Sequence, residues 1–139
     1  MRTEPTPLLE VRQLGKVFAA RRGLFTAGKA PLTAVEDASF RIGRAQIYGL
    51  VGESGSGKST LGRCILQLIR PDRGQVLFKG QDLCATPSRE LRPVRQKLQI
   101  VFQDPLAALS PRRTIWQSLQ EPLEQFEPGH RDAWRPRCE

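Results

Sequence analysis

The sequence contains no apolar run that approaches the ~20 residues needed for a membrane-crossing helix. Its first residues, MRTEPTPLLEV, include Glu4 and two prolines and form no apolar h-region, so they lack the pattern of a secretion signal. Cysteine is scarce, with three residues, no C-x-x-C spacing and an odd count, which favours reduced thiols over a disulfide framework. The chain is therefore expected to remain in the cytoplasm.

Length and composition are typical of one soluble globular domain, with 139 residues, 39% hydrophobic and 26% charged. The net charge of +8 permits two interpretations. One is contact with nucleic acid or an anionic membrane, and the other is an arginine-rich composition combined with a phosphate site. The basic residues are scattered along the chain and not massed on one element, which favours the second interpretation. No nucleic-acid partner is expected.

One stretch fits the pattern G-x-x-x-x-G-K-[ST], namely GESGSGKS at residues 52–59. The apolar run before it, residues 45–51, predicts a strand buried on both faces. The residues after it, 59–69, place apolar side chains on one stripe of a predicted helix. Strand, glycine loop and helix in this order predict a phosphate-binding loop, in preference to a Ser/Gly linker.

The residue types suit a polyphosphate. Gly52, Gly55 and Gly57 permit the positive φ angles that turn backbone N–H groups inward. The start of the following helix adds unpaired N–H groups and the positive end of a dipole. Lys58 is predicted to reach the β- and γ-phosphates, and the Ser59 hydroxyl to ligate Mg²⁺. The predicted nucleotide contacts in the loop are Gly52, Glu53, Ser54, Gly55, Ser56, Gly57, Lys58, Ser59 and Thr60.

Other segments show shorter patterns. Apolar alternation bounded by turn residues predicts strands at 8–14, 34–42, 74–79 and 98–102. Ser88 can cap a helix that Pro93 would confine to one turn, and Thr114 can cap a helix whose length Pro122 would limit. Residues 127–139 have no hydrophobic period and are predicted to form a disordered tail.

Three stretches together carry a family resemblance: GLVGESGSGKSTLGR at 49–63, PDRGQVLFKGQDL at 71–83 and IVFQDPLAALSPRRTI at 100–115. They resemble the nucleotide-binding subunit of an ABC transporter, and within that family the oligopeptide/dipeptide/nickel importer subgroup. The resemblance covers roughly residues 8–123. It implies an α/β fold with a P-loop NTPase core and an N-terminal antiparallel β component, in a partial nucleotide-binding domain at 8–126.

The resemblance assigns roles to two residues outside the loop, with ATP and Mg²⁺ as cofactors. Phe18 matches the aromatic position that stacks on adenine, although it could also be an ordinary core phenylalanine. Gln103 matches the Q-loop glutamine, which ligates Mg²⁺ beside Ser59 and senses the γ-phosphate, against the alternative of a polar residue at a strand end. Asp104 is not interpreted as a Walker B aspartate, because Gln103 interrupts the four apolar residues that such a strand requires.

The resemblance also implies partners, namely membrane permease subunits and a second ATP-binding subunit, at the cytoplasmic face of the inner membrane. Residues 103–113 belong to the region that links nucleotide state to the permease in this family. The signature LSGGQ, the Walker B strand and the histidine switch are not found in the sequence. The tripeptide at 109–111 lacks the signature glycines, and His130 lies in the predicted tail.

The catalytic set is therefore incomplete, with Lys58 and Gln103 as its only contributors. The chain is expected to resemble the N-terminal part of an importer ATPase, shortened by truncation, frameshift or gene annotation. Efficient ATP hydrolysis by this chain alone is not expected. Three alternatives stay open: a non-hydrolytic nucleotide-binding remnant, an unrelated P-loop phosphotransferase, and a basic nucleic-acid binder.

Overall fold

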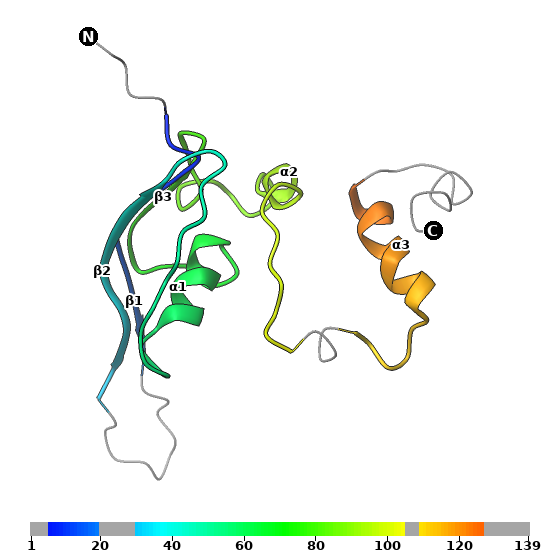
Figure 1. The fold of residues 1–139 in the computed structure, drawn as a ribbon, viewed down its shortest axis with the longest axis horizontal. Helices are drawn as coiled ribbons and strands as arrows, with labels where there is room; N and C mark the ends of the chain where they lie inside the picture. Colours follow the sequence, from blue (N-terminus) through cyan, green and yellow to red (C-terminus); the bar gives the residue numbers. More distant parts are fainter. Residues whose placement is uncertain (1–5, 20–29, 105–108, 127–139) are drawn as a thin grey trace. The chain divides into compact units, whose positions relative to one another are not determined.

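The computed structural model describes residues 6–19, 30–104 and 109–126, and the chain divides into two compact units between Leu91 and Arg92. The first unit is built on a four-stranded sheet in the order β2-β1-β3-β4. Figure 1 labels β1, β2 and β3 of this sheet. Its strands are β1 (Leu9–Phe18), β2 (Leu32–Ile42), β3 (Arg73–Phe78) and β4 (Gln81–Asp82). Every pairing is antiparallel, which confirms the antiparallel β component predicted for this part of the chain.

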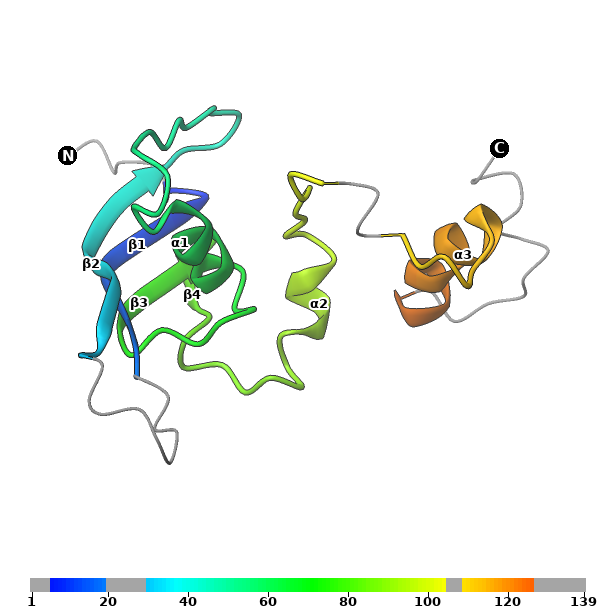
Figure 2. The same ribbon diagram turned by 90° about the horizontal axis from the view of Figure 1, so that it is seen from below.

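The core of the first unit lies between one face of this sheet and helix α1 (Lys58–Ile65), which crosses that face (Figure 2). Because side chains alternate along a strand, one face of the sheet supplies the apolar residues. The side chains buried there come from three strands and from α1: Val11, Leu14, Val35, Val76, Phe78, Leu61 and Cys64. This packing holds the start of α1 against the sheet.

Helix α1 is shorter than predicted, since it ends at Ile65 and not near residue 69. Gln67 takes a left-handed backbone with φ 55°, which the helix cannot continue through. The Gln67 side chain also donates from Nε2 to the Cys64 carbonyl oxygen at 2.8 Å, so it occupies one of the carbonyl groups left over at the helix end. The early end leaves Leu68 exposed.

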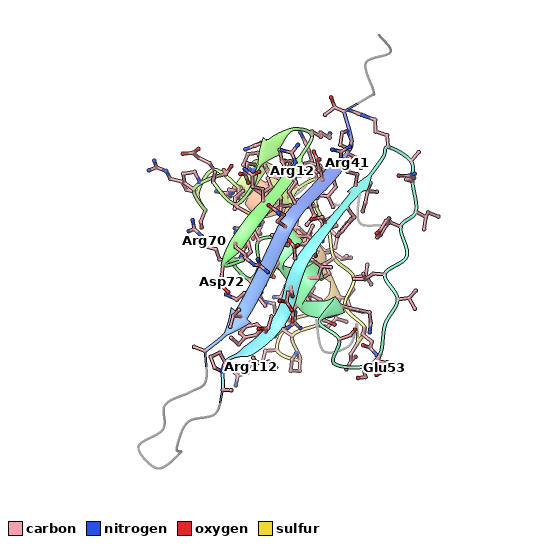
Figure 3. All side chains as sticks on the ribbon, turned by 90° about the vertical axis from the view of Figure 1, so that its left-hand side faces the viewer. Arg12, Arg41, Glu53, Arg70, Asp72 and Arg112 are labelled. Atoms are coloured by element: carbon pink, nitrogen blue, oxygen red, sulfur yellow. The ribbon has the colours of Figure 1, made fainter. Side chains whose placement is uncertain are left out.

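The strand predicted at residues 45–51 is not formed. Ala45 has φ 53° in a turn, which the Gln46 side chain closes by accepting from the Gly43 N–H at 2.7 Å. The rest of the segment returns along the sheet toward Glu53 without pairing, and Val51 is 95% exposed (Figure 3). A strand exists only where a neighbour completes its hydrogen bonds, and no neighbour pairs with this segment among the residues the structure describes.

In the second unit, the strand predicted at 98–102 is also absent, and Val101 is 91% exposed. The unit instead contains α2 (Arg92–Arg95) and α3 (Ile115–Phe126). Arg92 donates to the Gln125 carbonyl, so α2 meets the end of α3. The helix predicted to follow Ser88 is placed differently, because α2 begins at Arg92 and takes Pro93 into its first turn, where the missing N–H costs no helical bond.

Helix α3 also differs from its prediction, because it continues past Pro122 to Phe126. A proline within a helix removes one N–H donor but does not prevent the following residues from keeping helical angles. Within the described residues, no helix is long and apolar enough to cross a lipid bilayer. The disordered tail predicted at 127–139 lies outside the described residues.

Candidate functional site

The loop before α1 takes the predicted positive φ at two of its three glycines, whereas Gly52 has a φ outside that region. Gly55 has φ 84° and Gly57 has φ 91°, both in the left-handed region that glycine enters without strain. Gly57 is the N-cap residue of α1, and no side chain caps the helix there. The first helical N–H groups, those of Lys58, Ser59 and Thr60, have no partner within the helix. They form the anion-attracting start of α1, and no acidic residue lies in its first turn.

The Lys58 side chain curls back over the loop. Its Nζ donates to the carbonyl oxygens of Gly52 and Glu53, both at 2.6 Å, and lies 3.4 Å from the Ser56 hydroxyl. The Ser56 N–H in turn donates to the Glu53 carbonyl at 3.2 Å, which closes a turn inside the loop. The ammonium is thereby held over the loop that leads into the helix N-terminus, where it adds a full positive charge to the partial charge of the helix end.

Helix packing positions the loop against the sheet. A Cβ built on Gly57 would lie 2.0 Å from the Ala34 carbonyl oxygen and 3.9 Å from a methyl group of Val35. The backbone of the loop therefore touches the backbone of β2, and only glycine fits at this contact. The loop itself is exposed at residues 52–56, so a bulky anion can approach it from solvent.

Phe18, predicted to stack on adenine, ends β1, and the residue is 38% exposed. It pairs with Leu32 of β2, two residues before the Ala34 that contacts Gly57. Strand β2 thus brings the aromatic residue and the loop to neighbouring positions of one unit. The ring is also close to a cation, because Lys16 Nζ lies 5.6 Å from its centroid.

Gln103 lies in the second unit, is exposed, and stands at a bend and not at the end of a strand. The structure brings together the residues of the loop and places Phe18 in the same unit. Gln103 belongs to the other unit, so the predicted metal ligation by Gln103 beside Ser59 stays a prediction. Among the described residues, no three acidic, histidine or cysteine side chains gather into a metal site.

Sequence reasoning missed one part of this unit. The Asp72 carboxylate, to which no role was assigned, accepts from the Val17 N–H at 2.7 Å and from Lys16 Nζ at 3.0 Å. The Val17 hydrogen bond, followed by the Lys16 ion pair, lowers the pKa of Asp72 below its ordinary value. An aspartate in a Pro-Asp-x-Gly turn was the available signal, but the strand that it would reach could not be named from sequence.

Comparison with known proteins agrees with this geometry. The sequence matches the ABC transporter family over residues 35–136, so the chain belongs to the ABC transporter family. It is 45% identical over 117 residues to an oligopeptide transport ATP-binding protein, AppF of Bacillus subtilis, covering 84% of this chain and 36% of that protein. It is 42% identical over 130 residues to a glutathione import ATP-binding protein, GsiA of Salmonella paratyphi A, covering 94% of this chain and 21% of that protein.

Solved structures show the same fold. A dimeric bacterial ABC transporter cassette aligns with a TM-score of 0.78 at 24% identity, over 93% of this chain and 53% of that one. A dimeric ATP-binding cassette bound to ADP and Pi aligns with a TM-score of 0.76 at 23% identity, over 94% of this chain and 53% of that one. The fold is therefore that of an incomplete ABC-type P-loop NTPase. The chain spans between about a fifth and about a third of the length of the curated relatives it matches (21–36%).

Proposed function

We propose that this chain binds ATP with Mg²⁺ through residues 52–60, as the nucleotide-holding part of the ATP-binding subunit of a peptide-type ABC importer. The observation that carries the proposal is the loop geometry. Two left-handed glycines lead into a helix N-terminus, and the Lys58 ammonium is held across the same loop. The first-turn N–H groups and this ammonium supply the donors that a triphosphate accepts, so the residues fit the cofactor.

Each residue has a task in this proposal. The backbone of Gly52 to Gly57 surrounds the phosphates, and Lys58 exchanges its bonds with loop carbonyls for bonds to phosphate oxygens. The Ser59 and Thr60 hydroxyls lie at the start of α1, where Ser59 ligates Mg²⁺ and Thr60 contacts phosphate. Phe18 stacks on the base, and Gln103 adds a second protein ligand to the metal. Bound Mg²⁺ neutralises charge on the phosphate oxygens.

The importer context rests on the family and on the names of the relatives. Subunits of this kind act at the cytoplasmic face of a membrane with permease partners and pair with a second ATP-binding subunit. The proposal for this chain is the same arrangement, with residues 103–113 in the coupling region. The 139 residues contain no LSGGQ signature and no Walker B carboxylate pair. Since hydrolysis needs a group that orients water, this chain alone is proposed to bind ATP without efficient turnover.

The test is MgATP binding by calorimetry with the full chain. Lys58→Ala is expected to raise the dissociation constant by about 10-fold to 100-fold, because it removes a charge-assisted hydrogen bond worth ~1.5–3 kcal/mol. Lys79→Ala removes a lysine from the same unit, directly after β3, and should leave binding unchanged. Equal affinities for Lys58→Ala and the unaltered chain would refute the site. Brisk steady-state ATP turnover would refute the non-hydrolytic part of the proposal.

A further inference from the structure

The last residues of β1 are hydrogen-bonded to a side chain on the side where β3 pairs with the rest of the strand. Strand β1 pairs with β3 only as far as Gly15, which faces Arg73. The Asp72 N–H adds one more bond to the Gly15 carbonyl at 2.9 Å. Beyond this point the Asp72 carboxylate, and not β3, accepts the Val17 N–H, at 2.7 Å. Asp72 lies where β3 begins, at the edge of the sheet (Figure 3).

The second oxygen of the same carboxylate holds Lys16. Lys16 Nζ lies 3.0 Å from Asp72 Oδ1, and the Lys16 side chain is only 15% exposed. Residues two apart on a strand share a face, so Lys16 and Phe18 point the same way. The ammonium accordingly lies 5.6 Å from the centroid of the Phe18 ring. Asp72 therefore fixes both the peptide before Phe18 and the cation beside its ring.

We propose that Asp72 is a positioning residue for base recognition, which orients Phe18 by bonding Val17 and Lys16 at the end of β1. The proposal rests on the proposed function, in which Phe18 stacks on adenine. The Phe18 ring is placed for stacking before nucleotide binds. One oxygen of the Asp72 carboxylate holds the peptide before Phe18, and the other oxygen holds the Lys16 ammonium beside the ring. Without Asp72, the Val17 N–H loses its acceptor and the Lys16 ammonium loses its ion-pair partner. The Phe18 ring then samples other orientations.

The test measures the contribution of the base to binding separately from that of the phosphates. Dissociation constants are measured for MgATP and for magnesium tripolyphosphate, which occupies the loop without a base. Their ratio is the base preference, expected to be about tenfold in the unaltered chain, since stacking of a base on an aromatic ring is worth ~1–3 kcal/mol. Phe18→Ala should abolish this preference. Asp72→Ala should remove most of it while changing tripolyphosphate affinity by less than about twofold, a split that a general loss of structure would not produce.

Asp82→Ala is the matched control. The Asp82 carboxylate also accepts from a backbone N–H, that of Cys84 at 2.9 Å, and from the Gln75 side chain at 2.9 Å. It belongs to the same sheet but to β4, away from β1 in the strand order. Its loss should leave the base preference unchanged. Asp72→Asn keeps an oxygen for Val17 and removes the charge facing Lys16, so it should lower the preference without abolishing it.

The outcomes distinguish failure of this inference from failure of the proposed function on which it rests. If Phe18→Ala abolishes the preference while Asp72→Ala and Asp72→Asn keep it, Phe18 stacks on the base but the positioning proposal is wrong. If the unaltered chain shows no preference, or Phe18→Ala retains it, the base contact itself is wrong and the inference fails with it. Should Asp72→Ala lose tripolyphosphate binding as well, Asp72→Asn decides, and an unchanged preference in that variant overturns the proposal.

Discussion

The Ala34 carbonyl oxygen stands 2.0 Å from the point that a Cβ on Gly57 would occupy. Two segments that are distant in sequence, β2 and the start of α1, therefore meet backbone to backbone. This contact places the helix N-terminus beside the strand that pairs with the end of β1. The candidate phosphate and base contacts within the first unit depend on it, because any side chain at residue 57 would separate the loop from the sheet.

Gly57→Ala is predicted to destabilise the first unit. The left-handed backbone at φ 91° costs a non-glycine residue roughly 1–3 kcal/mol, and the clash with Ala34 adds to this cost because a backbone carbonyl in a sheet cannot turn aside. Urea denaturation followed by circular dichroism would measure the loss as a lower midpoint. MgATP binding should weaken in parallel, since the loop and the helix N-terminus share this residue.

Two other glycines serve as controls for this substitution. Gly62 lies within α1 with open space around its added Cβ, so Gly62→Ala should stabilise the unit by roughly 0.5–1 kcal/mol through helix propensity. Gly55 also has open space but a φ of 84°, so Gly55→Ala isolates the conformational cost without a clash. A midpoint for Gly57→Ala equal to that of Gly55→Ala would contradict the role of the Ala34 contact.

Sequence patterns predict some parts of this fold and miss others. The antiparallel strands were predictable because their alternation matches a half-buried sheet. The loop was predictable because its glycines and Lys58 have spacing that only a phosphate loop requires. The strands at 45–51 and 98–102 were wrong, because an apolar run indicates burial but does not provide the neighbour that makes a strand.

Side-chain contacts between residues distant in the chain could not be predicted from the sequence, for a different reason. The Asp72 carboxylate reaches residues 55 and 56 positions away, and no local pattern encodes that distance. The close approach of Gly57 to Ala34 likewise depends on how α1 lies on the sheet. The position of Gln103 near the loop stays a prediction, since it belongs to the second unit.

The first unit is predicted to lose stability in mild acid. Hydrogen bonds from Arg12 and then Arg41 lower the pKa of Glu10, and the Val17 N–H and then Lys16 lower that of Asp72. Each carboxyl binds its proton more weakly when folded than when unfolded. Their stabilisation is therefore fully present above the ordinary values of 4.5 and 3.8 and is lost as the pH falls through the lower folded values.

Urea midpoints measured between about pH 6 and about pH 3 check this. Stability should fall across the acid end for the unaltered chain, and the fall should be shallower for Glu10→Gln and for Asp72→Asn. Both variants should also be less stable than the unaltered chain near neutral pH, where each lost carboxylate is ionised. Identical slopes in all three proteins would show that these ion pairs do not contribute to acid sensitivity.

The two described cysteines are predicted to resist alkylation while the chain is folded. Burial raises the pKa of the Cys64 thiol and also that of Cys84, so less reactive thiolate is present at a given pH. In a Cys138→Ser background at pH 8, iodoacetamide should label the folded chain on the order of tenfold more slowly than the chain in urea. Cys64, which is fully buried, should react more slowly than the partly exposed Cys84.

The thiols change the folding stability with pH in the opposite direction to the carboxyls. A raised pKa means that the folded state favours the neutral thiol, so the contribution of these groups is present below the ordinary value of 9.0 and is lost as the pH rises through the folded value. The Cys64→Ala variant should remove part of the alkaline fall in stability. Equal labelling rates with and without urea would contradict the burial of these side chains.

In the second unit, the start of α3 is predicted to depend on a reciprocal cap. The Thr114 hydroxyl accepts from the Gln117 N–H at 3.2 Å, and the Gln117 side chain accepts from the Thr114 N–H at 2.9 Å. This pairing is a capping box, in which two otherwise unpaired donors are satisfied. Thr114→Ala should therefore cost α3 about 1 kcal/mol, which corresponds to about fivefold faster amide hydrogen exchange in its first turns.

Thr114→Ser keeps a hydroxyl acceptor and should exchange at a rate close to that of the unaltered chain. Gln117→Ala removes only the returning half of the cap, so its effect on α3 exchange should be smaller than that of Thr114→Ala. Mass spectrometry of peptides spanning residues 114–126 gives the rates, and peptides from β1 provide an internal reference. Exchange in α3 that is unchanged by Thr114→Ala would mean that the bond from Ser118 N–H to the Thr114 carbonyl at 3.1 Å, which that variant retains, suffices to start the helix.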